Sequence, residues 1–209
     1  MKRAILLGSL AVILGLASSS ASADTIFTLT QNGCSGGCGA GPFGTITLSQ
    51  TGANVNVTLA LASANNERFA GTGAGDALEF NVLNAVTGDI TNISSGFALG
   101  PSPDSASTFG SFLFSVECTT CQGGQSGNSH GPLSFTVQNA LISDFVANAG
   151  GYYFASDIAV TLDKSTNTGN VAAIGPGTTP PSVPEPSTLM LFGTGVTALG
   201  GLIRRRFAA

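Results

Sequence analysis

The sequence is poor in several residue types, and each shortage narrows what the protein does. Its 209 residues include no tryptophan, one histidine and 9% charged residues. Lys, Glu and Gln, which solvate helix surfaces, are scarce, and this argues against a helical domain. A catalytic triad needs a base held rigidly beside its nucleophile. The single histidine, His130, lies in a polar glycine-rich stretch that fixes no such geometry. The sequence therefore predicts no catalytic residue and a protein that is not an enzyme.

Positive charge is nearly absent from the centre of the chain. Between Asp24 and Ser182, ten acidic residues stand against Arg68 and Lys164, which gives a net charge of −8. Such a surface repels phosphate backbones, so nucleic-acid binding is excluded. The acidity most simply serves solubility.

The first 23 residues have the three parts of a secretory signal peptide. Two basic residues precede an apolar run, 4–17, and a small-residue stretch ends with Ala21-Ser22-Ala23. A charged start, an apolar run and an A-x-A site predict cleavage by signal peptidase between Ala23 and Asp24. The remaining chain is then exported.

Short runs of alternating apolar and polar residues fill the segment 24–174. This pattern predicts an all-β domain with about eight to ten strands, folded as a single β-sandwich with jelly-roll or Greek-key connections. A β-helix is the alternative, but no short periodic motif supports it. The predicted strands are 25–30, 43–50, 54–62, 77–84, 88–93, 96–99, 108–118, 133–138, 152–162 and 170–174, with 141–148 a short helix or a strand and 101–107 a loop.

The four cysteines form two close pairs, Cys34-x3-Cys38 and Cys118-x2-Cys121. Exported thiols meet an oxidising environment, which favours disulfides. A four-cysteine zinc site and free thiols are the alternatives. Of the three possible connectivities we expect local pairing, 34 with 38 and 118 with 121, because these partners are close in sequence. Pairing across the two motifs would stabilise the domain more, by about 3–5 kcal/mol.

Several acidic residues are candidates for a ligand site. Glu79 and Glu117 fall opposite the apolar residues of their strands, which predicts solvated side chains, with a sugar site as the alternative if the two faces adjoin. Asp76, Asp89 and Asp104 lie in predicted loops and are candidates for a calcium site, although their spacing matches no EF-hand loop. We expect no cofactor and assign no metal ligand.

The last 27 residues combine a stiff triplet, an apolar segment and a basic end. Each proline of Pro184-Glu185-Pro186 disfavours helix in the residue before it, so the triplet is expected to be extended and accessible. The segment 189–203 has no charge and spans roughly 22 Å as a helix, against a hydrocarbon core of about 30 Å. Arg204, Arg205 and Arg206 predict a cytoplasmic tail behind this transmembrane helix. A Gly/Thr/Pro linker, 175–182, joins the domain to this tail, 183–209.

This order of parts resembles the PEP-CTERM sorting signal of bacteria that carry an exosortase. The matching residues are Pro184, Glu185, Pro186, the apolar run 189–203 and the three terminal arginines, about an eighth of the chain. The resemblance implies that a membrane-embedded exosortase recognises the triplet, cuts near it and releases or transfers the protein at the cell surface. The alternative is an ordinary C-terminal membrane anchor behind a proline-rich stalk.

These features together predict a non-enzymatic cell-surface or extracellular-matrix protein. Its precursor is held in the inner membrane, and its mature form reaches the cell surface or the medium. By resemblance, such proteins accompany exopolysaccharide and biofilm production. The expected partners are signal peptidase, an exosortase, the membrane before processing, and exopolysaccharide. The alternative function is a carbohydrate- or calcium-binding β-sandwich module at the cell surface.

Overall fold

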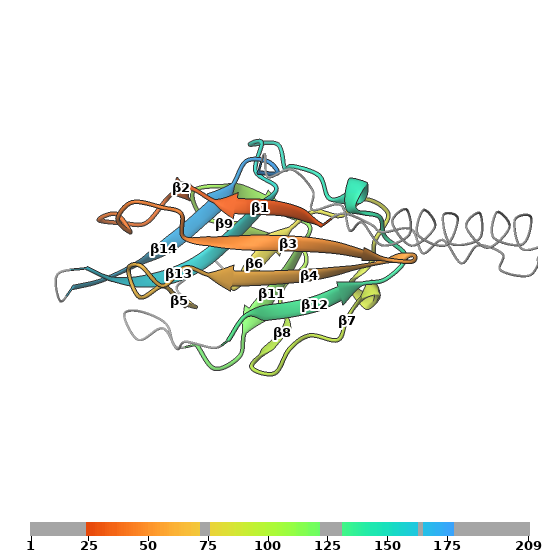
Figure 1. Ribbon diagram of the computed structural model, residues 1–209, viewed down its shortest axis with the longest axis horizontal. Coiled ribbons are helices and arrows are strands. Elements are labelled where there is room, and N and C mark those ends of the chain that lie inside the picture. Colours follow the sequence, from red (N-terminus) through yellow and green to blue (C-terminus); the bar gives the residue numbers. More distant parts are fainter. Residues whose placement is uncertain (1–23, 72–75, 122–130, 163–164, 178–209) are drawn as a thin grey trace, which may run out of the picture. The chain divides into compact units, whose positions relative to one another are not determined.

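The computed structural model describes residues 24–71, 76–121, 131–162 and 165–177. Within these ranges the chain consists of antiparallel strands and two short 3-10 helices, η1 (Thr87–Asp89) and η2 (Ile142–Asp144), with no α-helix (Figure 1). The prediction of an all-β chain is confirmed for the described residues.

The first sheet has five strands in the order β1-β3-β4-β12-β7. Its centre is a hairpin in which Thr51 pairs with Asn54 and Gly52 adopts a positive φ of 61°. Glycine at the first position of a two-residue turn suits the twist of the flanking strands. This hairpin was predicted from the sequence and is confirmed. The strands are β1 (Thr25–Leu29), β3 (Gly44–Thr51), β4 (Asn54–Leu61), β7 (Ile90–Thr91) and β12 (Leu133–Val137).

The second sheet has seven strands in the order β2-β14-β13-β6-β11-β8, with β5 paired to β13. Its longest ladder joins β13 and β14 over nine residue pairs, from Phe154 opposite Ala173 to Leu162 opposite Ser165. The strands are β2 (Gln31–Asn32), β5 (Arg68–Phe69), β6 (Leu78–Phe80), β8 (Phe97–Leu99), β11 (Phe114–Cys118), β13 (Phe154–Leu162) and β14 (Ser165–Ala173).

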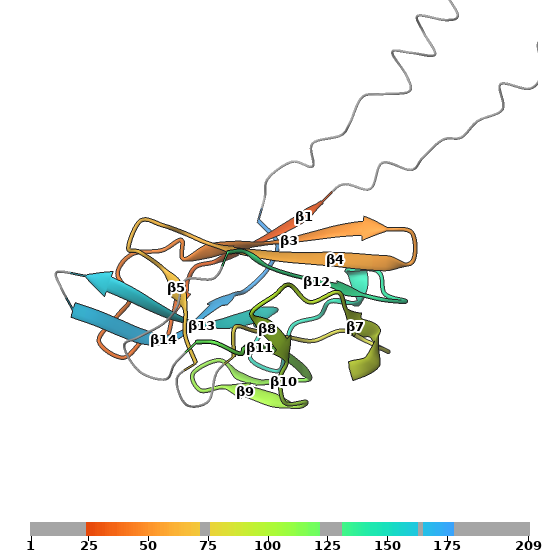
Figure 2. The same cartoon turned by 90° about the horizontal axis from the view of Figure 1, so that it is seen from below.

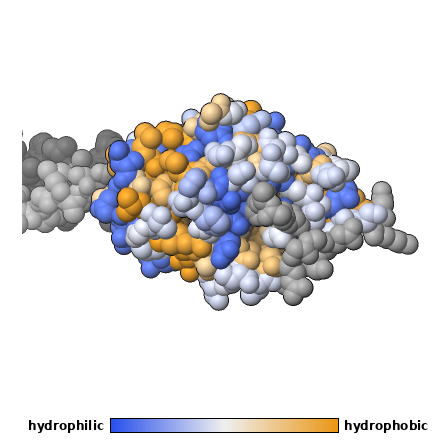
Figure 3. Space-filling model, turned by 180° about the vertical axis from the view of Figure 1, so that it is seen from behind, coloured by the Kyte–Doolittle hydropathy of each residue, from blue (hydrophilic) through white to orange (hydrophobic). Residues whose placement is uncertain are grey.

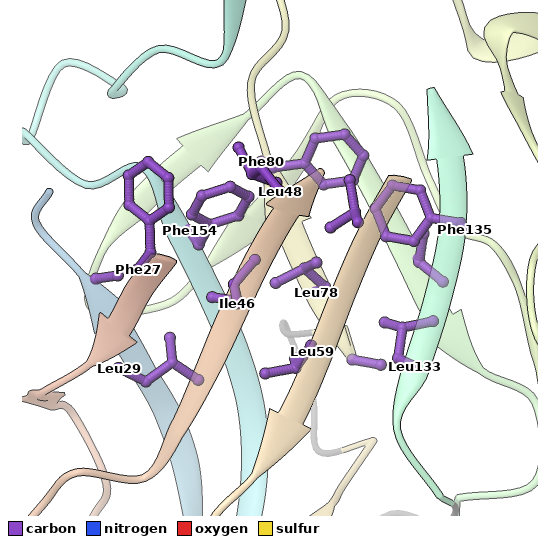
Figure 4. Packing of buried hydrophobic residues seen from close by; sticks show 14 of the residues in the cluster. Phe27, Leu29, Ile46, Leu48, Leu59, Leu78, Phe80, Leu133, Phe135 and Phe154 are labelled. Carbon is purple, nitrogen blue, oxygen red and sulfur yellow. The ribbon is translucent and has the colours of Figure 1, made fainter. Parts of the chain in front are cut away.

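One hydrophobic core draws side chains from both large sheets (Figure 4). Phe27 of β1 meets Phe154 of β13 edge-on, with ring centroids 4.9 Å apart. Phe80 of β6 stacks on Phe135 of β12 at 5.2 Å. Aromatic pairs of this kind contribute about 0.5–1.5 kcal/mol beyond the area that they bury. The inward positions of the two sheets therefore hold each other in place.

A separate two-stranded sheet, β9 (Asp104–Ala106) with β10 (Gly110–Phe112), lies on the other side of the seven-stranded sheet (Figure 2). Its hydrophobic residues pack on the outward side chains of that sheet, in a cluster of Ala106, Phe109, Phe112, Tyr152, Ala155 and Ala172. We call this element the β9–β10 hairpin. It turns the outward face of the seven-stranded sheet into a covered surface.

The β9–β10 hairpin corrects two predictions. The predicted single strand 108–118 is two strands that separate at Leu113, which is 50% exposed and whose amide donates to Asn81 Oδ1 at 2.8 Å. As a result Phe112 packs in the hairpin cluster, while Phe114 belongs to the main core. The predicted loop 101–107 contains β9.

Smaller differences concern short elements. The prediction for 88–93 is replaced by η1 followed by β7, and that for 141–148 by η2. The strand predicted at 77–84 is only three residues long, and the one predicted at 170–174 begins at Ser165. Two-residue strands β2 and β5 were not predicted, because alternation needs more than two residues to be recognised.

The two ends of the described domain meet at the free edge of β1. Phe27 forms an isolated antiparallel bridge with Pro176, and the Gly177 amide donates to Ile26 O at 2.6 Å. The last described residues therefore lie beside the first strand.

Candidate functional site

Both cysteine pairs form local disulfides, as predicted. Cys34 is bonded to Cys38 and Cys118 to Cys121, with Cα atoms 5.6 Å and 5.3 Å apart. Among the described residues no cysteine is free. Each bond closes a short loop beside the main core, against which Cys34, Cys118 and Cys121 pack. These cysteines are structural and are not available as zinc ligands.

The outward face of the five-stranded sheet is a regular array of hydroxyl and amide groups. The register aligns Thr47 of β3 with Thr58 of β4 and Ser134 of β12. In the next row Thr136 donates to Asn56 Oδ1 at 2.9 Å, and Asn56 Nδ2 donates to Thr51 Oγ1 at 3.1 Å. We call these residues, with Thr45 and Ser49, the hydroxyl face. None of them carries a charge, and in Figure 1 the face is formed by the broad strands β3, β4 and β12.

Exposed hydrophobic residues do not compete with this face as a candidate site. On the side opposite to Figure 1, apolar patches are interrupted by polar residues (Figure 3). Scattered surface hydrophobics are normal for a folded domain. Among the described residues the large exposed ones are Leu83, Val86, Leu113, Leu141 and Ile174.

The outward face of the seven-stranded sheet carries carboxylates instead, and here the prediction for Glu79 was wrong. Glu79 is not solvated but fully buried, at 0% exposure, because the β9–β10 hairpin lies over this face. In register it lies between Ser115 of β11 and Ala155 of β13. Glu117, on the same face of β11, is half-buried. Asp157 of β13 is 1% exposed and was not among the predicted candidates.

Two of the three predicted calcium candidates, Asp76 and Asp104, adjoin Glu79. The Asp76 amide donates to Glu79 Oε1 at 3.1 Å, and the negative charge of Asp104 acts on both Asp76 and Glu79. Asp89 lies elsewhere, where its carboxylate accepts the Val86 amide at 2.9 Å beside η1. The structure thus separates Asp89 from the other two.

Burial perturbs the acid–base properties of these carboxyl groups. The pKa of Asp76 is raised to about 6, mainly by burial and also by the charges of Asp104 and Glu117, although a hydrogen bond with Ser115 opposes the rise. Burial also raises the pKa of Glu79 well above its ordinary value, although the hydrogen bond from the Asp76 amide opposes this. Loss of water around a carboxylate disfavours its charged form, and nearby negative charges add to the effect. The four acids Asp76, Glu79, Asp104 and Asp157 are called the acidic cluster below.

Residues 182–206 match the family model for the PEP-CTERM protein-sorting motif. The chain carries a PEP-CTERM sorting signal. This finding confirms the resemblance derived from Pro184, Glu185 and Pro186. The PEP-CTERM motif marks an exported protein that an exosortase sorts, by way of a membrane-anchored precursor, to the surface or the outside of the cell. No curated protein and no solved structure matches this chain.

The residues of the PEP-CTERM signal lie outside the described residues, and so do Ala23, His130 and the three terminal arginines. Asp24, on the other side of the predicted signal-peptidase site, is exposed just before β1. Across the described ranges, no helix has the length and apolar character that crossing a membrane requires. The signal-peptide cleavage site and the transmembrane segment 189–203 therefore stay predictions.

Proposed function

We propose that this chain is a non-enzymatic surface or extracellular-matrix protein whose body is a β-sandwich and whose two terminal segments are removed during export. The PEP-CTERM signal at 182–206 carries the proposal. Residues 1–23 are its signal peptide, 24–174 its folded domain, 175–182 the linker and 183–209 the exosortase substrate. The aromatic contacts between β1 and β13, and between β6 and β12, support the sandwich assignment.

The test of this proposal is replacement of Glu185 by Ala in the native host. The variant loses the charged group between the two prolines, so the exosortase is expected to leave an uncleaved precursor in the inner membrane. Intact mass of the recovered protein measures both cleavage points at once. Thr179→Ala in the linker is the matched control and is expected to mature normally. Normal maturation of the Glu185 variant would overturn the sorting mechanism.

A second candidate function, binding of a neutral glycan, is favoured by the hydroxyl face. Strands about 4.8 Å apart, with outward residues repeating every ~6.7 Å, present hydroxyl and amide groups at regular intervals. Such groups pair with sugar hydroxyls without the desolvation cost of a charge. The proposed ligand class is an uncharged exopolysaccharide, which fits a protein delivered outside the cell.

Replacing Thr58, at the centre of the hydroxyl face, with Lys tests the glycan proposal. The substitution places a long charged side chain across three strands and is expected to weaken binding on an array of neutral glycans at least tenfold, about 1.4 kcal/mol. Thr119→Lys introduces the same charge at an exposed turn on the other sheet and is expected to bind like the parent. Equal binding by both variants, or no binding by the parent, would remove this candidate.

A further inference from the structure

The acidic cluster occupies one defined place in the fold, between the seven-stranded sheet and the β9–β10 hairpin. Glu79 comes from β6 and Asp157 from β13, both on the outward face of the sheet. Asp104 begins β9 in the covering hairpin. Asp76 precedes β6, and its carbonyl accepts the Asp157 amide at 2.8 Å, which ties it to the sheet. Elements far apart in the sequence thus bring carboxyl groups to one buried place.

Glu79 is the member of the acidic cluster that points to a ligand. Its Oε1 accepts the Asp76 amide, but its Oε2 is buried and has no hydrogen-bond partner. The charges that act on Glu79 most strongly are those of Asp104, Asp76 and Asp157, and all three are negative. A buried carboxylate is retained in proteins when it is paired, hydrogen-bonded or bound to a metal. One buried oxygen of Glu79 therefore lies among negative charges with no hydrogen-bond partner in the described part of the chain.

Asp76 lies beside Glu79 in the same oxygen-rich place. Its Oδ2 is buried, and the side chains of Ser115 and Asp104 adjoin its carboxyl group. The Cα of Gly100 packs so closely against it that a methyl group at Gly100 would overlap both Asp76 Oδ2 and Ser115 Oγ. Ser115 Oγ in turn donates to Pro101 O at 2.9 Å, so hydroxyl and carbonyl oxygens border the carboxylates. The surroundings are oxygen-rich and leave little room for a larger ligand.

We propose that Asp76, Glu79 and Asp104 bind one Ca²⁺ ion beneath the β9–β10 hairpin. Calcium takes six to eight oxygen ligands in irregular geometry, and carboxylates, hydroxyls and backbone carbonyls all qualify. The ion supplies the positive charge that opposes the repulsion within the acidic cluster. It also joins the covering hairpin, through Asp104, to the sheet, through Glu79.

Binding requires a small rearrangement. Among the described residues, no three Asp, Glu, His or Cys side chains are already close enough together to hold a metal ion. Asp104 lies on the two-stranded hairpin, outside both large sheets, so the proposal requires its carboxylate to draw closer to Asp76 and Glu79 when the ion binds. Extracellular calcium modules bind the ion at roughly 0.1–1 mM, and we expect an affinity in this range.

The test uses the full-length chain in detergent micelles, stripped with chelator and then titrated with calcium chloride or magnesium chloride at pH 7. Thermal unfolding is followed by circular dichroism, and binding by calorimetry. Calcium at one hundred times its Kd is expected to raise Tm by about 5–10 °C, because binding stabilises only the folded state. Magnesium, which demands stricter octahedral geometry, is expected to raise Tm much less.

Two variants locate the site. Glu79→Gln and Asp104→Asn are each expected to weaken calcium binding at least tenfold. In chelator both are expected to unfold at or above the Tm of the parent, because each removes a repelling charge while keeping a side-chain oxygen. Asp144→Asn is the matched control: its carboxylate accepts the Leu141 amide at 2.7 Å beside η2, and it is expected to bind calcium like the parent.

Two results would contradict calcium binding at the acidic cluster. If the cluster holds only protons, the parent shows no calcium-dependent rise in Tm up to about 10 mM, a concentration above the range of extracellular calcium sites. An equal calcium response in the parent and Glu79→Gln would place the ion elsewhere. Either outcome overturns the proposal, and neither affects the sorting function, which depends on residues 182–206.

Discussion

The outward faces of the two large sheets differ in the polar groups that they carry and in their exposure to solvent. On the five-stranded sheet this face carries Thr, Ser and Asn side chains that bond to one another across strands, as Thr136 does with Asn56. On the seven-stranded sheet it carries Glu79 and Asp157, and the β9–β10 hairpin covers it. A domain with ten acidic residues thus exposes one face without charge and buries carboxylates on the other.

This difference is the reverse of the usual arrangement, in which charged residues face water and are almost never fully buried unless paired. Burying Glu79 without a partner for Oε2 destabilises the folded protein, so the feature needs a compensating role. Keeping charge off the hydroxyl face leaves a neutral surface available to a neutral ligand. The contrast therefore separates a candidate contact surface from a candidate internal ion site.

The largest expected change in stability comes from weakening the packing of the β9–β10 hairpin, which covers the seven-stranded sheet. Phe112 is 1% exposed in the hairpin cluster, and Phe112→Ala is expected to lower the free energy of unfolding by about 3–5 kcal/mol through lost packing and a cavity. Thr47→Ala, on the uncovered hydroxyl face, is expected to change it by less than about 0.5 kcal/mol. Urea unfolding measures both. Similar losses for the two variants would mean that the two outward faces are packed alike.

A smaller loss of stability is expected when Asn148, which bonds to the backbone beside the β9–β10 hairpin, is replaced. Asn148 Nδ2 donates to Phe109 O at 2.8 Å, and its Oδ1 accepts the Gly150 and Tyr152 amides at 2.9 Å and 3.1 Å. Asn148→Ala leaves these groups without partners and is expected to destabilise by roughly 1–3 kcal/mol.

Asn56→Ala is the control for Asn148→Ala. Asn56 also bonds to neighbouring side chains, but it lies on the exposed hydroxyl face, where water replaces those bonds. The expected loss is within about 0.5 kcal/mol. Hydrogen exchange of the Gly150 and Tyr152 amides provides a local readout, and unchanged protection in Asn148→Ala would contradict the role given to Asn148.

The smallest effect is a dependence of stability on pH in the presence of chelator. The folded state holds protons on Asp76 and Glu79 more tightly than the unfolded chain does, because their pKa values are raised. The contribution of these groups to stability is then greatest below about pH 4 and falls as pH rises toward 6, because the unfolded chain releases these protons at a lower pH than the folded protein does. The negative charges of Asp104, Glu117 and Asp157 act on these two groups and contribute to their raised pKa values.

Glu79→Gln is expected to flatten this pH profile, because glutamine does not titrate. Asp144→Asn again serves as the control and is expected to leave the slope around pH 4–6 close to that of the parent. Thermal unfolding between pH 4 and 7 measures both variants. A parent whose Tm rises steadily over this range would contradict the raised pKa values of the acidic cluster.

The sequence was sufficient to predict the all-β composition, the β3–β4 hairpin and the two local disulfides. Each rests on a local pattern: strict alternation on both sides of Gly52, and cysteines three or four residues apart. It was not sufficient at Leu113, because alternation continues from Phe112 to Phe114 while the strand changes its pairing partner. A period of two residues records which way a side chain points and not which neighbour it meets.

The acidic cluster was only half predictable for the same reason. Alternation correctly placed Glu79 opposite the apolar residues of its strand, but it could not show that a second layer covers that face. Asp157 was missed because β13 is buried on both sides, so that Phe154 to Val160 form a continuous buried run without alternation. The only signal was the polar pair Ser156-Asp157 inside that run. Ser156 Oγ donates to Ala77 O at 2.7 Å, which accounts for the burial of Ser156.

The bond between Gly177 and Ile26 has a mechanical consequence for an exported precursor. Because the chain enters and leaves the domain beside β1, tension applied to either end acts first on this one edge strand. The end of the five-stranded sheet that lies away from this spot is the one where β3 begins, at Gly44 opposite Leu29.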